Sequence, residues 1–300
     1  MQISDWSVFL LLIKLVVYVA TAAMAGCLVL RVLNRDSEIT DDKFTVFNSL
    51  LKRWLLICLS AALIAAILQV FVDAGSMAES GLSGMTDAFM LEIIWQSVIG
   101  DQAVVRIPAF IFAIVIVAAW KKNISSVTNF NFVLTLFTLM IIISSFTFTG
   151  HSAEKNLLIK GLFMLHIFAI SCWVGALWPL YKSCQLLPKV EVKRLMHQFG
   201  QLAIAIILVL LVSGVTLLLQ YLNSVAELFT SNYGQLILLK LLLVSGMLLL
   251  GAWHKLSLVP QITEKHHVVT LKRSISVEIL IASLVLITTS VFTTLVGPPI

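Results

Sequence analysis

Two histidines of the 300-residue chain, His151 and His166, have the positions and the chemistry expected of metal ligands. His166 lies about nine residues inside the apolar stretch Leu157–Tyr181, roughly 14 Å below its outer end at 1.5 Å per helical residue. Neutral imidazole binds copper, zinc and haem iron, and an ionisable side chain at membrane depth is costly and usually functional. We therefore expect His166 to be a ligand. The alternative is a histidine that only hydrogen-bonds to a neighbouring helix.

His151 precedes the same stretch, within Gly150-His151-Ser152. It is either a solvated loop histidine or a metal ligand at the entrance to a path. The nominal depths of His151 and His166 differ by several helical turns. The two histidines share one ion only if the connection 150–156 dips into the membrane; otherwise they mark two positions on one path.

Two other side chains near His166 are candidates for a metal path. Trp173 follows His166 by seven residues, which places both on one face of a helix. Met164 carries a thioether, the kind of ligand that selects Cu(I), but it belongs to another face.

Glu278 is the carboxylate inside an apolar stretch, about one helical turn from the inner start of Ser274–Val296. His254 ends the preceding stretch, so both side chains are expected at similar depth. A carboxylate there can relay protons or bind a cation. The alternative is an ion pair with Lys272 or Lys255 near the interface.

Arg106 and Lys240 lie at the outer ends of the third and seventh apolar stretches. One interpretation is that both extend to lipid headgroups. The other is that they hold an anionic group or pair with a carboxylate inside the membrane. Two fixed positive charges would repel Cu⁺, so they argue against an unobstructed cation pore at this level.

The composition identifies the elements that must position these side chains. Hydrophobic residues make up 60% of the chain and charged residues only 12%, against about 25% charged in soluble domains, and mean hydropathy is +1.03. The chain is thus expected to be a membrane protein and not a nucleic-acid-binding protein, despite its net charge of +5. No phosphate-binding loop and no nucleophile–base pattern can be identified, so we expect no enzyme.

A membrane-spanning helix needs about 20 apolar residues, and eight stretches qualify. We therefore predict an all-α bundle of eight transmembrane helices, forming one domain over residues 1–300. The predicted spans are Trp6–Leu33, Trp54–Val72, Val104–Trp120, Phe130–Thr149, Leu157–Tyr181, Phe199–Leu222, Gln235–Leu256 and Ser274–Val296.

Most of the 20 lysines and arginines follow the first, third, fifth and seventh spans. Because basic loops stay in the cytoplasm, both termini are predicted to lie outside. In a bacterium this places the chain in the inner membrane with both termini in the periplasm. The longest outer connection, 73–103, is acidic, and residues 86–99 within it are expected to form a surface helix. Its methionines, Met77, Met85 and Met90, either capture copper or form an apolar helix face.

A short repeat suggests two halves, 1–149 and 150–300. Gly100 precedes Arg106 by six residues, as Gly234 precedes Lys240, and a tryptophan marks the inner end of each of these spans. Four spans per half preserve the orientation, so a duplication would be parallel, about an axis along the membrane normal.

An ordered set of short blocks resembles the CopD/PcoD family of copper-resistance inner-membrane proteins, whose domain also occurs in YcnJ-type copper-uptake proteins. The resemblance covers most of the chain. This chain has Ala176 where the family has a second glycine, and His254-Lys255 where it usually has Asn-Arg. The blocks are Gly100…Arg106, Gly150-His151-Ser152, Leu165-His166 with Trp173-Val174-Gly175, Phe199-Gly200-Gln201 with Ser213-Gly214, Tyr233-Gly234…Lys240, Pro260, Arg273-Ser274…Glu278 and Pro298-Pro299.

The resemblance implies copper transport or handling, with import from the periplasm and a periplasmic CopC-type copper carrier as partner. It also favours His151 and His166 as copper ligands. Two other hypotheses remain open. One is a b-type haem protein or quinone-linked electron carrier, in which Arg106 and Lys240 pair with haem propionates. The other is a protein that docks a copper chaperone through connection 73–103 and transports nothing.

Overall fold

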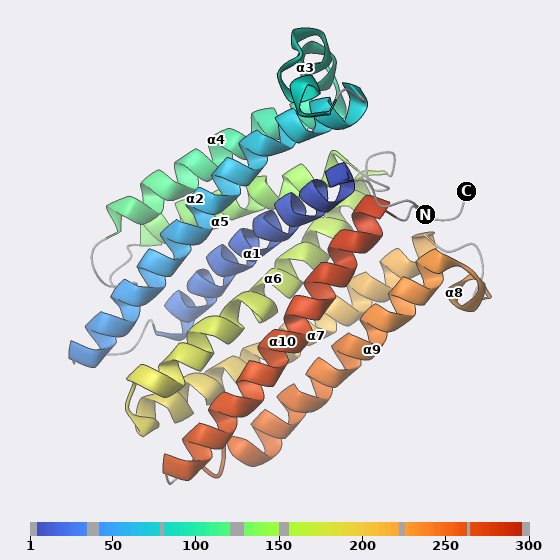
Figure 1. Ribbon diagram of the computed structural model, residues 1–300. Coiled ribbons are helices and arrows are strands. Elements are labelled where there is room, and N and C mark those ends of the chain that lie inside the picture. The colour runs from blue at the N-terminus through green and yellow to red at the C-terminus, as the bar shows by residue number, and fades with distance from the viewer. Residues whose placement is uncertain are drawn as a thin grey trace.

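The computed structural model describes residues 5–34, 42–78, 81–120, 129–149, 156–221, 226–262 and 265–295. In these ranges all regular elements are helical, and eight helices are long and apolar enough to cross a membrane. The predicted all-α bundle of eight membrane helices is therefore confirmed (Figure 1).

The eight long helices form two groups of four in chain order. The first group is α1 (Asp5–Leu33), α2 (Asp42–Ala78), α4 (Val98–Ala119) and α5 (Asn129–Ser144), which continues as the 3-10 turn η3 (Ser145–Thr147). The second group is α6 (Leu157–Leu186), α7 (Lys189–Tyr221), α9 (Asn232–Trp253), which continues as the π-helical turn η5 (His254–Leu258), and α10 (Lys265–Leu295). The short elements are η1 (Gly81–Thr86), α3 (Ala88–Trp95) and α8 (Glu227–Thr230).

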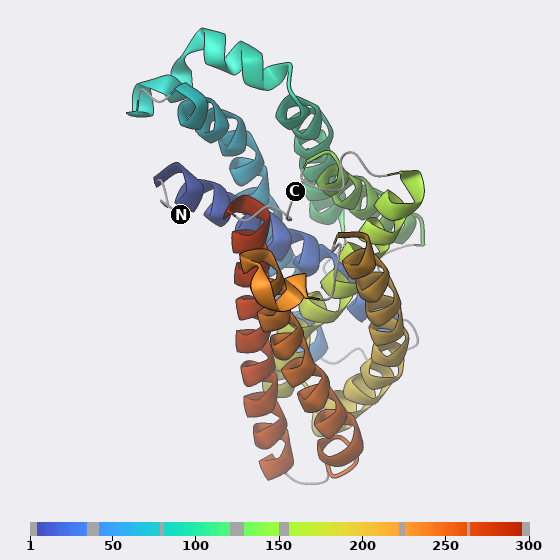
Figure 2. The ribbon, with the colours of Figure 1, turned by 90° about the vertical axis from the view of Figure 1, so that its right-hand side faces the viewer.

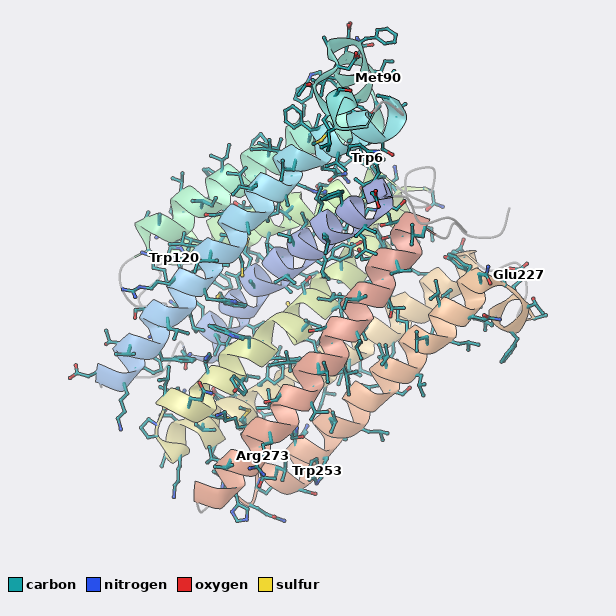
Figure 3. All side chains as sticks on the ribbon, viewed as in Figure 1. Trp6, Met90, Trp120, Glu227, Trp253 and Arg273 are labelled. Carbon is teal, nitrogen blue, oxygen red and sulfur yellow. The ribbon has the colours of Figure 1, made fainter. Side chains whose placement is uncertain are left out.

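The bundle has two chemically different ends. The start of α1 and the end of α10 lie at one end together with α3 and α8, and we call this the terminal end (Figure 1). Trp6, Met90 and Glu227 are there, whereas Trp253 and Arg273 lie at the opposite end (Figure 3). We call the opposite end the basic end, after Arg31, Lys52, Lys182, Lys193 and Arg273.

Several helices extend beyond the predicted spans at the basic end. The helix α2 begins at Asp42 and not at Trp54, α7 begins at Lys189, and α10 begins at Lys265. These extensions bury one apolar face, with Phe47 of α2, Leu195 of α7 and Leu271 of α10. Hydropathy identifies the part of a helix that meets lipid, so it misses a turn that is amphipathic and packs on neighbouring helices.

The surface helix predicted over residues 86–99 is shorter than expected. It is α3, which begins after Asp87, whose side chain accepts a hydrogen bond from the Met90 N–H at 2.9 Å. Such a cap satisfies a backbone donor that the first turn leaves unpaired. Phe89 and Trp95 are exposed while Ile94 is buried, so α3 presents apolar side chains to its surroundings.

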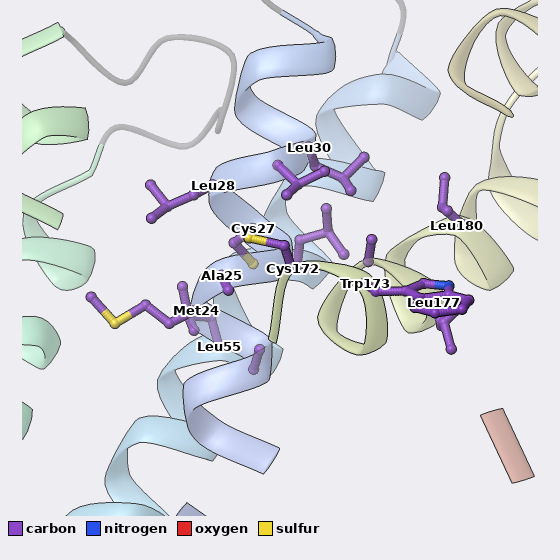
Figure 4. Close-up of a cluster of buried hydrophobic side chains, with 14 of the residues drawn as sticks. Met24, Ala25, Cys27, Leu28, Leu30, Leu55, Cys172, Trp173, Leu177 and Leu180 are labelled. Atoms are coloured by element: carbon purple, nitrogen blue, oxygen red, sulfur yellow. The ribbon is translucent and has the colours of Figure 1, made fainter. Parts of the chain in front are cut away.

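Helices α1 and α6 form the centre of the bundle and cross at Gly26 and Gly175. A Cβ atom on either glycine would overlap backbone atoms of the opposite helix. Small residues allow membrane helices to approach this closely. The side chains around the crossing, including Cys27, Cys172 and Trp173, form a buried hydrophobic cluster (Figure 4).

The second group of helices is packed less tightly than the first. The helix α7 packs on α6, while α9 pairs with α10 as a hairpin (Figure 2). The contact between α7 and this hairpin is made mainly at η5. Leucines on the outer faces of α7 and α9, such as Leu208, Leu242 and Leu249, are exposed, as expected for helices that contact lipid.

Candidate functional site

His166 is held at the interface of α6 and α7 by a hydrogen bond between its Nδ1 and Oγ of Ser213 at 3.1 Å. The Ser213 hydroxyl donates its hydrogen to the carbonyl of Val209 at 2.6 Å. With this one hydrogen given to Val209, Ser213 accepts from Nδ1 of His166. The neutral imidazole then carries its hydrogen on Nδ1, and Nε2 presents a lone pair, which is the form that binds metals.

Two neighbours of His166 shape its surroundings. A Cβ atom on Gly214 would lie 3.3 Å from Cε1 of the imidazole, so the glycine leaves room for the ring. Lys240 of α9 is half-buried and within electrostatic range of His166. Within the described ranges no hydrogen-bond acceptor or carboxylate engages the Lys240 ammonium. This charge disfavours a second cation beside His166 unless an anionic group enters with it.

Trp173 lies two turns further along α6 and is 3% exposed. Its indole Nε1 donates a hydrogen bond of 3.1 Å to Oε1 of Glu278 on α10. The carboxyl group of Glu278 is also 3% exposed, and its described partners do not include Lys255 or Lys272. Because α10 begins well before Ser274, Glu278 lies deeper in the bundle than its position in the predicted span indicated.

His254, which lies in the π-helical turn η5, also contacts Glu278. Its Nδ1 lies 3.4 Å from Oε2 of Glu278, and its Nε2 lies 2.6 Å from Oγ of Ser274. With Glu278 as a carboxylate, Nδ1 carries the hydrogen, and Nε2 accepts one from the Ser274 hydroxyl. π-Helical turns are rare and occur frequently at functional sites. We call Trp173, His254, Ser274 and Glu278 the glutamate cluster.

His166 and Trp173, which belongs to the glutamate cluster, thus mark two polar positions along α6, the first half-buried and the second buried. His166 is nearer to the terminal end, and the glutamate cluster is nearer to the basic end. Met164 belongs to neither, since its side chain packs against the main hydrophobic cluster. His151 lies outside the described residues. In the part of the chain that is described, no three His, Cys, Asp or Glu side chains form a group able to hold a metal ion.

Arg106 lies in a third polar cluster, in the first group of helices. Its guanidinium donates from Nε to Oγ of Ser145 at 3.0 Å, and from Nη1 to Oε1 of Gln69 at 3.2 Å and of Gln102 at 3.1 Å. The ring of Phe146 lies 4.8 Å from Cζ. Arg106 is 4% exposed, so it does not extend to the headgroups, and its described hydrogen-bond partners are neutral side chains, not carboxylates.

Sequence reasoning missed the serines and glutamines that hold these groups. Ser213 and Ser274 orient the two histidines, and Gln69 and Gln102 accept from Arg106. Serine and glutamine occur in membrane helices without any fixed spacing to their partners. The signal that was present is the pair Ser213-Gly214, which lies within a block of the family resemblance.

The fold and these clusters define a polytopic membrane protein with ionisable side chains buried between its helices, an arrangement that marks ion and substrate pathways. The sequence matches two protein-family models. The copper resistance protein D-like N-terminal domain matches residues 3–159, and copper resistance protein D matches residues 193–292. The chain belongs to the copper resistance protein D family.

Among curated proteins, the chain is similar to copper transport protein CutJ of Bacillus subtilis (strain 168). The two are 28% identical over 244 residues, which cover 79% of this chain and 44% of that protein. The chain therefore spans less than half the length of this relative. No solved structure matches the chain. Together the family and the relative show a membrane protein of a copper-handling family.

Proposed function

We propose that this chain carries copper through the bacterial inner membrane, with His166 as the ligand deep in the bundle. The observation that carries the proposal is the hydrogen bond between His166 Nδ1 and Ser213 Oγ. The bond fixes the ring. With the Ser213 hydroxyl donating to Val209, Nε2 is unprotonated, so a metal ligand is prepared where an unused histidine would be costly.

A deep position with one histidine as its described metal ligand suits transport better than storage. Conduction requires binding that is strong enough for the ion to enter and weak enough for it to leave. Three or four protein ligands would hold copper tightly, whereas one imidazole holds it weakly. We propose that the connection 150–155, with His151, supplies further ligands at the entrance.

The glutamate cluster is the second position on the proposed path. An anionic carboxylate in a buried site attracts a cation, and Trp173 and His254 hold the two oxygens of Glu278 in place. Copper that leaves His166 would move along α6 toward Glu278 and the basic end. Lys240 sets a positive charge beside His166, which favours the passage of one ion at a time.

The proposed direction is import. The charge distribution supports this direction, because basic loops tend to stay in the cytoplasm and the terminal end would then face the periplasm. A periplasmic CopC-type carrier would deliver copper at the terminal end, where η1 and α3 form the acidic outer connection. The chain would then act as a transporter and not as an enzyme.

Uptake of radioactive copper into liposomes that contain the purified protein tests this function. We expect His166→Ala to abolish protein-dependent uptake at equal protein incorporation. Met164→Leu, two residues away in the same helix and in apolar contact only, should preserve it. Unchanged uptake by His166→Ala would contradict the role of His166. No uptake by the unaltered protein would favour a docking role.

An absorption spectrum of the same preparation tests the haem alternative. A haem band that is lost in His166→Ala would show that His166 binds haem iron. The described residues give this alternative no added support, because Arg106 and Lys240 belong to different helix groups and both ring nitrogens of His254 are engaged.

A further inference from the structure

A cavity of about 490 Å³ opens at the basic end between the first turns of α7 and the turn η5. Its walls are partly apolar, with Val190, Val259 and Pro260, and partly basic. The basic residues come from both sides: Lys193, Arg194 and His197 from α7, and Lys255 from η5. None of them belongs to the glutamate cluster, and we call this cavity the basic cleft.

The Arg194 guanidinium forms hydrogen bonds and an ion pair with other residues of the protein. Its Nε and Nη2 contact Glu191 Oε2 at 2.9 and 2.8 Å, and Nη2 also donates to Oδ1 of Asn34 at 3.2 Å. Arg194 therefore joins α7 to the end of α1, and its charge is balanced by Glu191. His197 lies 3.2 Å from the side-chain nitrogen of Gln201 and contributes no fixed charge when neutral.

The two lysines of the basic cleft keep unused donors. Lys193 gives one hydrogen bond, to the carbonyl of Pro260 at 3.1 Å, and a lysine ammonium has three donors. Lys255 lays its methylene groups over Gly200, and in the described chain no hydrogen bond or ion pair engages its ammonium. Two positive charges from two separate elements thus face one cavity, and no carboxylate of the described residues pairs with either of them.

The position of the basic cleft indicates what neutralises these charges. Val190, at its rim, is 76% exposed, and the predicted membrane span of α7 begins only at Phe199, so the cleft lies at the level of lipid headgroups. Basic pockets between membrane helices on the cytoplasmic side bind anionic headgroups. Apolar walls beside two lysines match a molecule with a phosphate and an acyl chain.

We propose that the basic cleft binds the phosphate of an anionic phospholipid, with Lys193 and Lys255 as its two cationic contacts. The apolar walls receive the glycerol and the upper acyl chain. Lys255 and His254 are neighbours on η5, so the lipid is bound beside the turn that carries His254. This site is independent of copper transport and holds whether or not copper is carried.

Lipid retention tests the proposal. The protein is purified from vesicles of equal parts phosphatidylglycerol and phosphatidylcholine, and the bound lipid is counted by native mass spectrometry. We expect the unaltered protein to retain phosphatidylglycerol selectively. Lys193→Gln with Lys255→Gln should weaken this retention about 30-fold, since each basic residue near an anionic surface contributes a factor of about five.

Two control proteins make the outcome decisive. Lys182→Gln with Lys272→Gln removes the same charge from the basic end outside the cleft, and should retain the lipid; an equal loss there would overturn the site. Lys193→Arg with Lys255→Arg preserves the charge and should also retain it, which separates lost binding from lost folding. Displacement of the lipid by millimolar inorganic phosphate would assign the cleft to free phosphate and overturn a lipid site.

Discussion

The indole N–H of Trp173 donates a hydrogen bond to Oε1 of Glu278, joining α6 to α10 across 105 residues of sequence. The other carboxylate oxygen faces Nδ1 of His254 at 3.4 Å. Glu278 therefore has two roles that substitutions can separate. It links three elements of the second helix group, and it places a negative charge deep in the bundle.

Glu278→Gln should preserve the fold and lose copper uptake. The amide keeps an acceptor for Trp173 but carries no charge, so we expect thermal stability in detergent to change by less than about 1 kcal/mol. Copper uptake should fall about tenfold or more if the carboxylate attracts the ion. Glu278→Leu, by contrast, removes the acceptor of the Trp173 indole and of Nδ1 of His254 and should cost about 1–2 kcal/mol of stability. Normal uptake by Glu278→Gln would remove Glu278 from the proposed path.

Gly175→Ala should destabilise the protein strongly because its Cβ atom would overlap the carbonyl of Ala22 in α1. The carbonyl oxygen is a backbone atom and the Cβ position is fixed by the backbone of α6, so neither can rotate away. We expect the protein to lose about 1–3 kcal/mol or more of stability. The loss would appear as a lower temperature at which the monodisperse peak disappears in size-exclusion chromatography.

Gly161→Ala provides the matched control in the same helix, since nothing lies within 4 Å of its Cβ position. Alanine favours a helix over glycine by about 0.5–1 kcal/mol. This variant should therefore be as stable as the unaltered protein or slightly more stable. Equal stability of Gly161→Ala and Gly175→Ala would show that α1 and α6 do not cross at this point.

The eight spans could be predicted because lipid imposes a simple rule, a run of apolar residues as long as the bilayer is thick. The start of α2 could not be predicted, since Phe44 and Phe47 are buried by neighbouring helices and not by lipid. Hydropathy averaged over a window does not separate these two kinds of burial.

The residue types of the candidate site were predictable, but their partners were not. His166 and Glu278 stand out because ionisable groups are rare in membrane helices. Ser213 and Trp173 become their partners only through the packing of α6 against α7 and α10. Arg106 illustrates the same limit: its six-residue spacing from Gly100 was visible, but its partners Gln69 and Ser145 come from other helices.

Ser213→Ala should weaken the apparent copper affinity of uptake about 10–100-fold, as is typical when the partner of a metal-binding histidine is removed. Without Ser213 the imidazole loses the acceptor that keeps its hydrogen on Nδ1. Ser213→Thr retains a hydroxyl and should recover most of the affinity. Ser245→Ala is the control, because that hydroxyl makes the same kind of bond to its own helix, to Leu241 at 2.8 Å, but its described bonds include no histidine. An unchanged affinity in Ser213→Ala would mean that Ser213 does not orient a ligand.

Arg106→Lys should lower stability without changing copper uptake per folded molecule. A lysine has one nitrogen, so it cannot reproduce the fork that contacts Ser145, Gln69 and Gln102 together. We expect a loss of about 1–2 kcal/mol, because buried acceptors lose their donor. Arg53→Lys, an exposed arginine on α2, should stay within about 0.5 kcal/mol.

The comparison with His166→Ala then distinguishes the two clusters. The Arg106 cluster is built by α2, α4 and η3, whereas the proposed path runs along α6. Arg106→Lys should therefore reduce the amount of folded protein and leave copper uptake per folded molecule intact. His166→Ala should leave the amount of folded protein intact and abolish uptake. A stable Arg106→Lys protein with lost uptake would place Arg106 on the copper path, and the copper would then have to pass through the first helix group.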